Sequence, residues 1–310
     1  MSERKTQYAD FCSRHYVPLH FQPWWLDAVG TGGAWDVCLA LNGNGEVAGA
    51  LPYYRTQRFG LPLIRQAPLT AYGGPWLHYP PATDTRPLKR YDFEKKALNE
   101  LIRQLPRTVF FRQNFHPAVT NWMPFYRAGF RQSTRYTYLF PDLTDLEKVR
   151  AGFKNTLRTD LKKAEKVVTV QRADASPLLL FDLHRQSFRR QGLRPPYTSE
   201  TFRRLHAALL ERGQVACFIA RDHRSGAPHA ALCLAFDERS GSVLLTGADP
   251  VFKTSSAVWL LFWHALVFCS ERGLSLDFEG SMNRRIEKGF RAFGAQLTPY
   301  HQITKNEIMG

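Results

Sequence analysis

Residues 109–114 read Val-Phe-Phe-Arg-Gln-Asn, residues 274–279 read Leu-Ser-Leu-Asp-Phe-Glu, and each begins a copy of one longer pattern. After connectors of equal length, the copies continue as Phe-Tyr-Arg-Ala-Gly at 125–129 and Phe-Arg-Ala-Phe-Gly at 290–294. No gap is needed to align them, so Asn114 corresponds to Glu279. In each copy we predict a strand, a loop, a short helix that ends at glycine, and another strand. The duplication of 109–131 in 274–296 therefore predicts two similar α/β domains, with a site in the cleft between them.

The composition is that of a folded protein with room for two domains. The chain has 310 residues, 44% of them hydrophobic, which suffices for two cores of ordinary size. No apolar run reaches the roughly 18–20 residues of a membrane span, and the N-terminus lacks the apolar core of a signal peptide. The five cysteines are scattered and form no CxxC motif, which indicates neither a disulfide framework nor a zinc site. We expect a cytoplasmic protein without a metal.

The formal net charge is +15. A basic protein attracts polyanions such as nucleic acid, pyrophosphate groups or an anionic lipid surface. A simpler interpretation is that the charge serves solubility alone, and the composition does not decide between the two.

The pattern around the two copies is also duplicated. Residues 37–54 and 215–236 each read as a hairpin. A helix is predicted after each hairpin, at 88–105 and 256–272. Each half thus reads as a mixed sheet with helices on both faces. We place the domains at 1–143 and 144–310. The last strand, 296–304, could complete either of the two sheets.

A row of cations marks one predicted helix. Lys154, Arg158, Lys162 and Lys166 follow one another at intervals of four residues beside an apolar stripe, which places them on one helix face. Like charges at this spacing weaken an isolated helix by a few tenths of a kcal/mol per pair. The row therefore favours binding of an anionic partner. The alternative is a solvated helix face, partly neutralised by Asp160 and Glu165.

Two carboxylates end the strand of the second copy. Alternation along a strand would direct Asp277 and Glu279 to one face, at the strand end where α/β folds place active-site groups. A carboxylate there can act as a general base toward an amine, or position it. The alternative is an ion pair with the basic segment 284–288.

Two loops are candidates for binding. Residues 69–75, which include Tyr72, form a glycine-rich turn whose amides can bind an anion or a substrate backbone; a plain turn explains the pattern equally well. In the second half, Lys253, Ser255 and Ser256 precede a long apolar helix. The serines also suit a simple N-cap.

Taken in order, these segments resemble the Fem-type branch of the GNAT acyltransferase superfamily, whose members are two GNAT-like domains in one chain. The resemblance is carried by five segments that span nearly the whole chain: Tyr72-Gly-Gly-Pro75, Phe125-Tyr-Arg-Ala-Gly-Phe130, 155–164, Phe188-x-x-Gln191-Gly192 and Asp277-Phe-Glu-Gly280.

The resemblance implies transfer of an acyl or aminoacyl group from acyl-CoA or aminoacyl-tRNA to an amine acceptor, as in peptidoglycan or polysaccharide metabolism. It assigns the donor's pyrophosphate to Lys253, Ser255 and Ser256, and catalysis to Glu279 and Asp277. Substrate-binding residues would be Tyr72, Asn114, Arg158, Lys162 and Gln191.

The chain departs from this family in two places. The usual Gln/Arg-x-x-Gly-x-Gly/Ala pattern is absent from both loops, which weakens a coenzyme A assignment. Asn114 stands where several members carry an acid, and an amide cannot act as a base. Two alternatives to an enzyme remain at this point: a non-catalytic GNAT-fold module that binds nucleic acid or an anionic precursor, and a peripheral protein recruited to the membrane surface by its charge.

Overall fold

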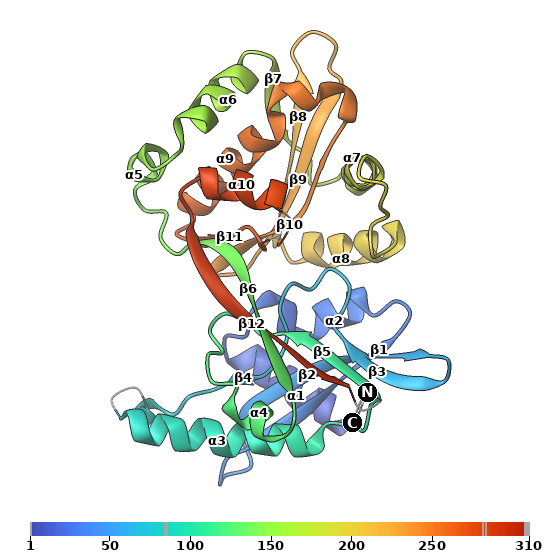
Figure 1. The fold of residues 1–310 in the computed structure, drawn as a ribbon, viewed down its shortest axis with the longest axis vertical. Coiled ribbons are helices and arrows are strands. Elements are labelled where there is room, and N and C mark those ends of the chain that lie inside the picture. Colours follow the sequence, from blue (N-terminus) through green and yellow to red (C-terminus); the bar gives the residue numbers. More distant parts are fainter. Residues whose placement is uncertain (1, 84–85, 281, 283, 307–310) are drawn as a thin grey trace. The chain divides into compact units, whose positions relative to one another are not determined.

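The computed structural model describes residues 2–83, 86–280, 282 and 284–306 (Figure 1). The chain divides into two compact units: unit 1 is Met1–Arg135 with Pro299–Gly310, and unit 2 is Tyr136–Thr298. This division differs at both ends from the sequence-predicted domains 1–143 and 144–310. Residues 136–143 belong to unit 2, and the chain returns to unit 1 after residue 298, because one strand begins in one unit and ends in the other at each of these places.

Unit 1 is a sheet covered by helices. Its elements are α1 (Glu3–Arg14), η1 (Leu19–Phe21), α2 (Pro23–Val29), β1 (Ala34–Leu41), β2 (Val47–Arg58), β3 (Leu61–Arg65), β4 (Trp76–Leu77), η2 (Pro81–Thr83), α3 (Pro87–Gln104), β5 (Phe110–Asn114) and α4 (Met123–Arg127). Strand β6 (Arg131–Phe140) starts in unit 1 and ends in unit 2, and β12 (Gln296–Asn306) makes the reverse passage.

The strand order in unit 1 is β1-β2-β3-β5-β12, and β4 pairs with β2. Only β3 and β5 run parallel in this set. The sequence did not assign the final strand to either sheet. In the structure this strand pairs with β5, from Gln302↔Asn114 to Asn306↔Phe110. Buried residues of α3, such as Leu98 and Leu101, pack on this sheet with Phe111, Phe125 and Ile303.

Unit 2 contains the remaining elements: α5 (Leu146–Ala151), α6 (Asn155–Glu165), β7 (Val168–Arg172), α7 (Pro177–Arg189), α8 (Ser199–Glu211), β8 (Val215–Asp222), β9 (Pro228–Phe236), β10 (Ser240–Ala248), η3 (Pro250–Ser255), α9 (Ala257–Ser270), β11 (Ser275–Asp277) and α10 (Arg284–Ala292).

The sheet of unit 2 is antiparallel except where β10 runs parallel to β11, and its order is β6-β11-β10-β9-β8-β7. Helices α6 and α9 cover one face and α7 with α8 the other (Figure 1). Because successive strand residues point to opposite faces, Phe218 and Leu232 join the α9 core, whereas Cys217 and Cys233 face α7 and α8.

The repeat is visible as β5–α4–β6 and β11–α10–β12. In both copies a glycine stands two residues after the helix with positive φ, Gly129 at 82° and Gly294 at 73°, a conformation that costs glycine little. The corresponding phenylalanines are buried, Phe125 against Phe115 and Phe130, and Phe290 against Phe262 and Phe278. The predicted fold class, a mixed α/β fold built as a tandem repeat, is confirmed. Among the described residues, no helix is long and apolar enough to cross a membrane.

Candidate active site

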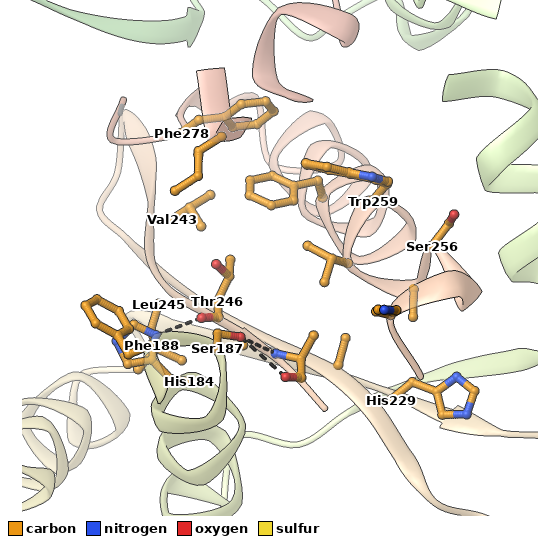
Figure 2. A pocket seen from close by; sticks show the side chains of 18 of the residues that line it. His184, Ser187, Phe188, His229, Val243, Leu245, Thr246, Ser256, Trp259 and Phe278 are labelled. Carbon is orange, nitrogen blue, oxygen red and sulfur yellow. Dashed lines mark hydrogen bonds between the residues drawn. The ribbon is translucent and has the colours of Figure 1, made fainter. Parts of the chain in front are cut away.

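A cavity of about 490 Å³ opens in unit 2 where β10 and β11 part. The two strands pair only from Ser240↔Ser275 to Ser242↔Asp277, whereas β10 continues to Ala248. The cavity is lined by the separated part of β10, α7, η3, the start of α9, the segment after β11, and α10 (Figure 2). The cavity thus lies beside the part of β10 that extends past the end of β11.

Strand β10 is irregular at the cavity. Its pairing with β9 shifts register between Val243 and Leu245, and such a bulge re-aims side chains and backbone groups. Val243, Leu244 and Leu245 all line the cavity. Further along, Ser187 of α7 accepts a hydrogen bond from the backbone N–H of Ala248 at 2.9 Å, which fixes the end of the strand. Residues 243–248 thus form one continuous side of the cavity.

The loop before α9 forms one wall. Lys253, Ser255 and Ser256, the three residues predicted to bind the donor, all line the cavity. Lys253 is exposed, Ser255 is buried, and Ser256 adopts the left-handed conformation with φ 60°. The N-cap position of α9 is Ser256, whose side chain makes no capping hydrogen bond, and the Ser255 hydroxyl accepts from Ala257 N at 3.3 Å. The helix N-terminus, which carries partial positive charge, therefore faces the same cavity as the Lys253 side chain.

The two carboxylates that end β11 have different environments. Asp277 is buried and accepts hydrogen bonds from the Thr137 hydroxyl and, at 2.7 Å, from Glu279 N. Glu279 lines the cavity. The expectation that strand alternation directs both to one face was wrong, because β11 ends at Asp277 and Glu279 has φ 54°. Asp277 thus anchors the turn that presents Glu279.

The turn also depends on Gly280. A Cβ atom at this position would lie 2.2 Å from the Tyr136 carbonyl oxygen, and φ is 26°. No other residue fits there without displacing β6. Glycine at this position therefore keeps the turn close to β6 while Glu279 borders the cavity.

Sequence reasoning missed His184 and Tyr197. His184 of α7 lines the cavity, with Nδ1 2.7 Å from the Thr246 carbonyl oxygen of β10 and Nε2 2.7 Å from the Tyr197 hydroxyl. A carbonyl oxygen only accepts, so Nδ1 carries the proton, and Nε2 accepts from Tyr197. Burial lowers the pKa of His184, which favours this neutral form.

The Tyr197 hydroxyl itself is shielded from water. Burial raises the pKa of Tyr197, and the Glu279 carboxylate raises it further. Tyr197 belongs to the loop before α8, and nothing in its local sequence indicates that it meets α7 and β10. His184 and Glu279 thus both line the cavity, and Tyr197 holds the His184 ring from behind.

The other predicted residues lie in different surroundings. Gln191 lines the cavity, whereas Arg158 and Lys162 are exposed on α6 and are not among the described lining residues. In unit 1, Tyr72 is buried against His116 and Tyr300. The Asn114 side chain donates to Ala71 O at 3.3 Å and accepts from Gln302 at 2.8 Å, so it joins β5 to a loop and to β12.

Comparison with known proteins defines the class. Residues 151–284, which contain the cavity's β10, η3 and α9, match the family described as Acetyltransferase (GNAT) domain. No curated protein sequence matches the chain.

The whole chain has the fold of FemX, as the sequence resemblance predicted. FemX superposes with a TM-score of 0.67 at 13% identity, over 97% of this chain and 96% of that chain. A lysylphosphatidylglycerol synthetase C-terminal domain, from a putative enzyme of Agrobacterium fabrum, gives 0.56 at 14% over 99% and 92%. A tandem GNAT protein from the clavulanic acid biosynthesis pathway gives 0.51 at 15% over 98% and 95%. The chain therefore has a tandem GNAT fold similar to that of FemX.

Proposed function

We propose that this protein transfers an acyl or aminoacyl group to an amine, with the donor bound in the cavity of unit 2. The observation that carries the proposal is the cavity itself, which opens between β10 and β11 and is bordered by the N-terminus of α9 and by Glu279. At one end of the cavity, the first backbone amides of α9 and the Lys253 side chain can bind phosphate. At the segment after β11, the Glu279 carboxylate can accept a proton from the amine.

The preferred donor is an acyl-CoA. Its diphosphate would lie against Lys253, Ser256 and the first amides of α9, since a helix N-terminus favours anions. Its extended arm would follow β10, whose bulged edge provides backbone hydrogen-bond groups. The apolar side chains of Trp259, Phe278 and Phe290, which also line the cavity, suit the uncharged part of such a donor.

The chemistry is attack of a neutral amine on the donor carbonyl. The C–N bond forms as the carbonyl becomes a tetrahedral oxyanion, which backbone amides stabilise. The intermediate collapses to an amide and expels the thiolate of coenzyme A, or the ribose hydroxyl oxygen if the donor is an ester. Glu279 accepts a proton from the amine, and the Tyr197–His184 pair orders the wall beside it.

An aminoacyl-tRNA is the alternative donor. The name of one structural relative, a lysylphosphatidylglycerol synthetase, describes a lysyl product and so favours an aminoacyl group. The exposed cations of α6, among them Arg158 and Lys162, suit a nucleic acid. The acceptor remains an amine of unspecified identity, in line with a role in cell-wall or polysaccharide metabolism.

The test is a pair of substitutions at Ser256. Ser256→Asp keeps a residue type that tolerates the left-handed conformation and caps helices, but it adds a negative charge where phosphates would bind. We expect coenzyme A affinity, measured by calorimetry, to fall at least about tenfold by charge repulsion. Ser256→Asn has the same shape without the charge and should stay within about threefold of the unaltered protein.

Each outcome decides one part of the proposal. Equal coenzyme A binding by the two variants would remove the loop from the donor site. If only aminoacyl-tRNA binds, and Lys162→Ala weakens that binding, the donor is the tRNA ester. Binding of neither donor would contradict acyl transfer. Salt-sensitive RNA binding without any turnover would instead support a non-catalytic module, which the exposed α6 row favours.

A further inference from the structure

Two cysteines that do not line the cavity face each other within unit 2. Cys217 of β8 is directly opposite Cys233 of β9 in the antiparallel register. Both side chains are completely buried, and His206 of α8, which is 2% exposed, lies beside them. The two sulfur atoms and one imidazole nitrogen are all within 4.8 Å of one another. The acyl-transfer proposal uses none of these three residues.

The backbone places the pair where cross-strand side chains approach most closely. Cys217 N donates to the Asp174 carboxylate at 2.7 Å, and Cys217 O accepts from Ala173 N at 2.9 Å. Both groups therefore point away from β9. In an antiparallel ladder such residues form a non-hydrogen-bonded pair, with Cα atoms about 4.5 Å apart. That separation lies within the span of a disulfide.

The distance between the sulfur atoms distinguishes a covalent bond from a metal site. Cys217 Sγ lies 2.8 Å from Cys233 Sγ, which is closer than the roughly 3.5–4 Å of non-bonded contacts. Two thiolates on a tetrahedral metal, with bonds of about 2.3 Å, would stand about 3.8 Å apart. Disulfide formation requires the two atoms to move together, to about 2.05 Å, whereas metal binding requires β8 and β9 side chains to spread in a packed core.

His206 supplies a proton acceptor for the reaction. Its Nε2 is 3.7 Å from Cys217 Sγ. Burial raises the pKa of Cys217 well above its ordinary value, and the neighbouring Cys233 adds to this, whereas His206 lowers it. Since the thiolate is the reactive form, oxidation is expected to be slow and to depend on a base within reach.

We propose that Cys217 and Cys233 form an oxidisable pair that closes into a cross-strand disulfide when it reacts with hydrogen peroxide. His206 accepts the Cys217 proton, and the thiolate attacks one peroxide oxygen. The O–O bond breaks, and hydroxide leaves as water with that proton, which gives a sulfenic acid. Cys233 then attacks this sulfur, the S–O bond breaks, and a second water leaves. Two thiols and one peroxide become one disulfide and two waters.

The experiment treats the reduced full-length protein with hydrogen peroxide. The protein is then denatured, its remaining thiols are alkylated, and the digest is examined by mass spectrometry. We expect a linked peptide that contains Cys217 and Cys233, two hydrogen atoms lighter than the separate peptides, which dithiothreitol cleaves. Cys12, which is less buried, serves as an internal comparison and should react without forming this link.

Substitutions separate the pair from general oxidation. Cys217→Ser or Cys233→Ser should abolish the linked peptide. Cys269→Ser is the matched control, because Cys269 is equally buried in unit 2 but packs in the α9 core, and the link should form as before. His206→Gln should slow closure about tenfold or more and shift its pH profile, with the fold verified by circular dichroism.

Two results would overturn the proposal. One is conversion of Cys217 and Cys233 to separate sulfinic acids, or their survival as thiols, while Cys12 is oxidised. The other is purified protein that holds zinc or copper at one ion per chain, with both thiols unreactive until a chelator removes it. The second result would assign the same three residues to a metal.

Discussion

At the scale of single residues, the proposed chemistry depends on Glu279. Glu279→Gln keeps the size of the side chain but removes its ability to accept a proton. We expect acyl-transfer turnover to fall by about 10²- to 10⁴-fold, with donor affinity unchanged because the phosphate end of the cavity is intact. Initial rates and calorimetry measure the two effects. Glu165→Gln, an exposed change on α6, is the control, and equal turnover in both variants would show that Glu279 is not the base.

The Tyr197 hydroxyl gives a second prediction at this scale. Tyr197→Phe leaves the buried His184 Nε2 without its 2.7 Å donor, and an unsatisfied buried acceptor costs about 1–3 kcal/mol. Urea denaturation should show a loss of this size in the free energy of unfolding of unit 2. Tyr136→Phe, at a 39% exposed tyrosine, should change stability little. If the two variants are equally stable, the Tyr197–His184 hydrogen bond contributes nothing to folding.

At the scale of elements, the corresponding phenylalanines of the two copies have different surroundings. Phe125 is fully buried in unit 1, whereas Phe290 is 7% exposed and borders the cavity. Phe125→Ala should cost about 3–5 kcal/mol, since it leaves a new void in a filled core. Phe290→Ala enlarges a space that already exists, so we expect a smaller loss. Denaturation curves of both variants test this order, and a larger loss for Phe290→Ala would contradict it.

The sequence was most informative where local pattern decides structure. Hydrophobic periodicity and turn residues predicted the duplicated strands, the hairpins and the long helices, because these depend on neighbours a few positions apart. The family resemblance assigned Lys253 and Ser256 to donor binding, and both line the cavity; their role in binding stays a prediction. His184 and Tyr197 could not be assigned, since His184 meets Thr246 only because α7 packs on β10, and Tyr197 meets His184 from a separate loop. The Glu279 turn was also missed, because alternation ends where the strand ends.

At the scale of the whole molecule, histidines that are partly or fully buried couple folding to pH. Burial, and then the nearby His20, lower the pKa of His116 from 6.5 to about 4. Between these values the unfolded chain binds a proton that the folded chain does not. The free energy of unfolding should therefore fall as the pH drops from about 6.5 to about 4, by about 3 kcal/mol from this residue. His184, whose pKa is also lowered, acts in the same direction.

Denaturation of the intact protein and of His116→Gln across this pH range measures the effect. The variant should show a shallower loss of stability on acidification, whatever its stability at neutral pH. Parallel curves for the two proteins would mean that His116 takes up its proton equally well in the folded state.

The passage of β6 and β12 between the units has a consequence for biosynthesis. The β5 edge of unit 1 pairs with Gln302–Asn306, which the ribosome makes after all of unit 2. The first half of the nascent chain must therefore wait with an open strand edge, and such edges promote aggregation. Unit 2 depends on no later segment than Thr298, so it is free to fold first. The ribosome thus begins unit 1 first, but unit 1 is completed only after unit 2.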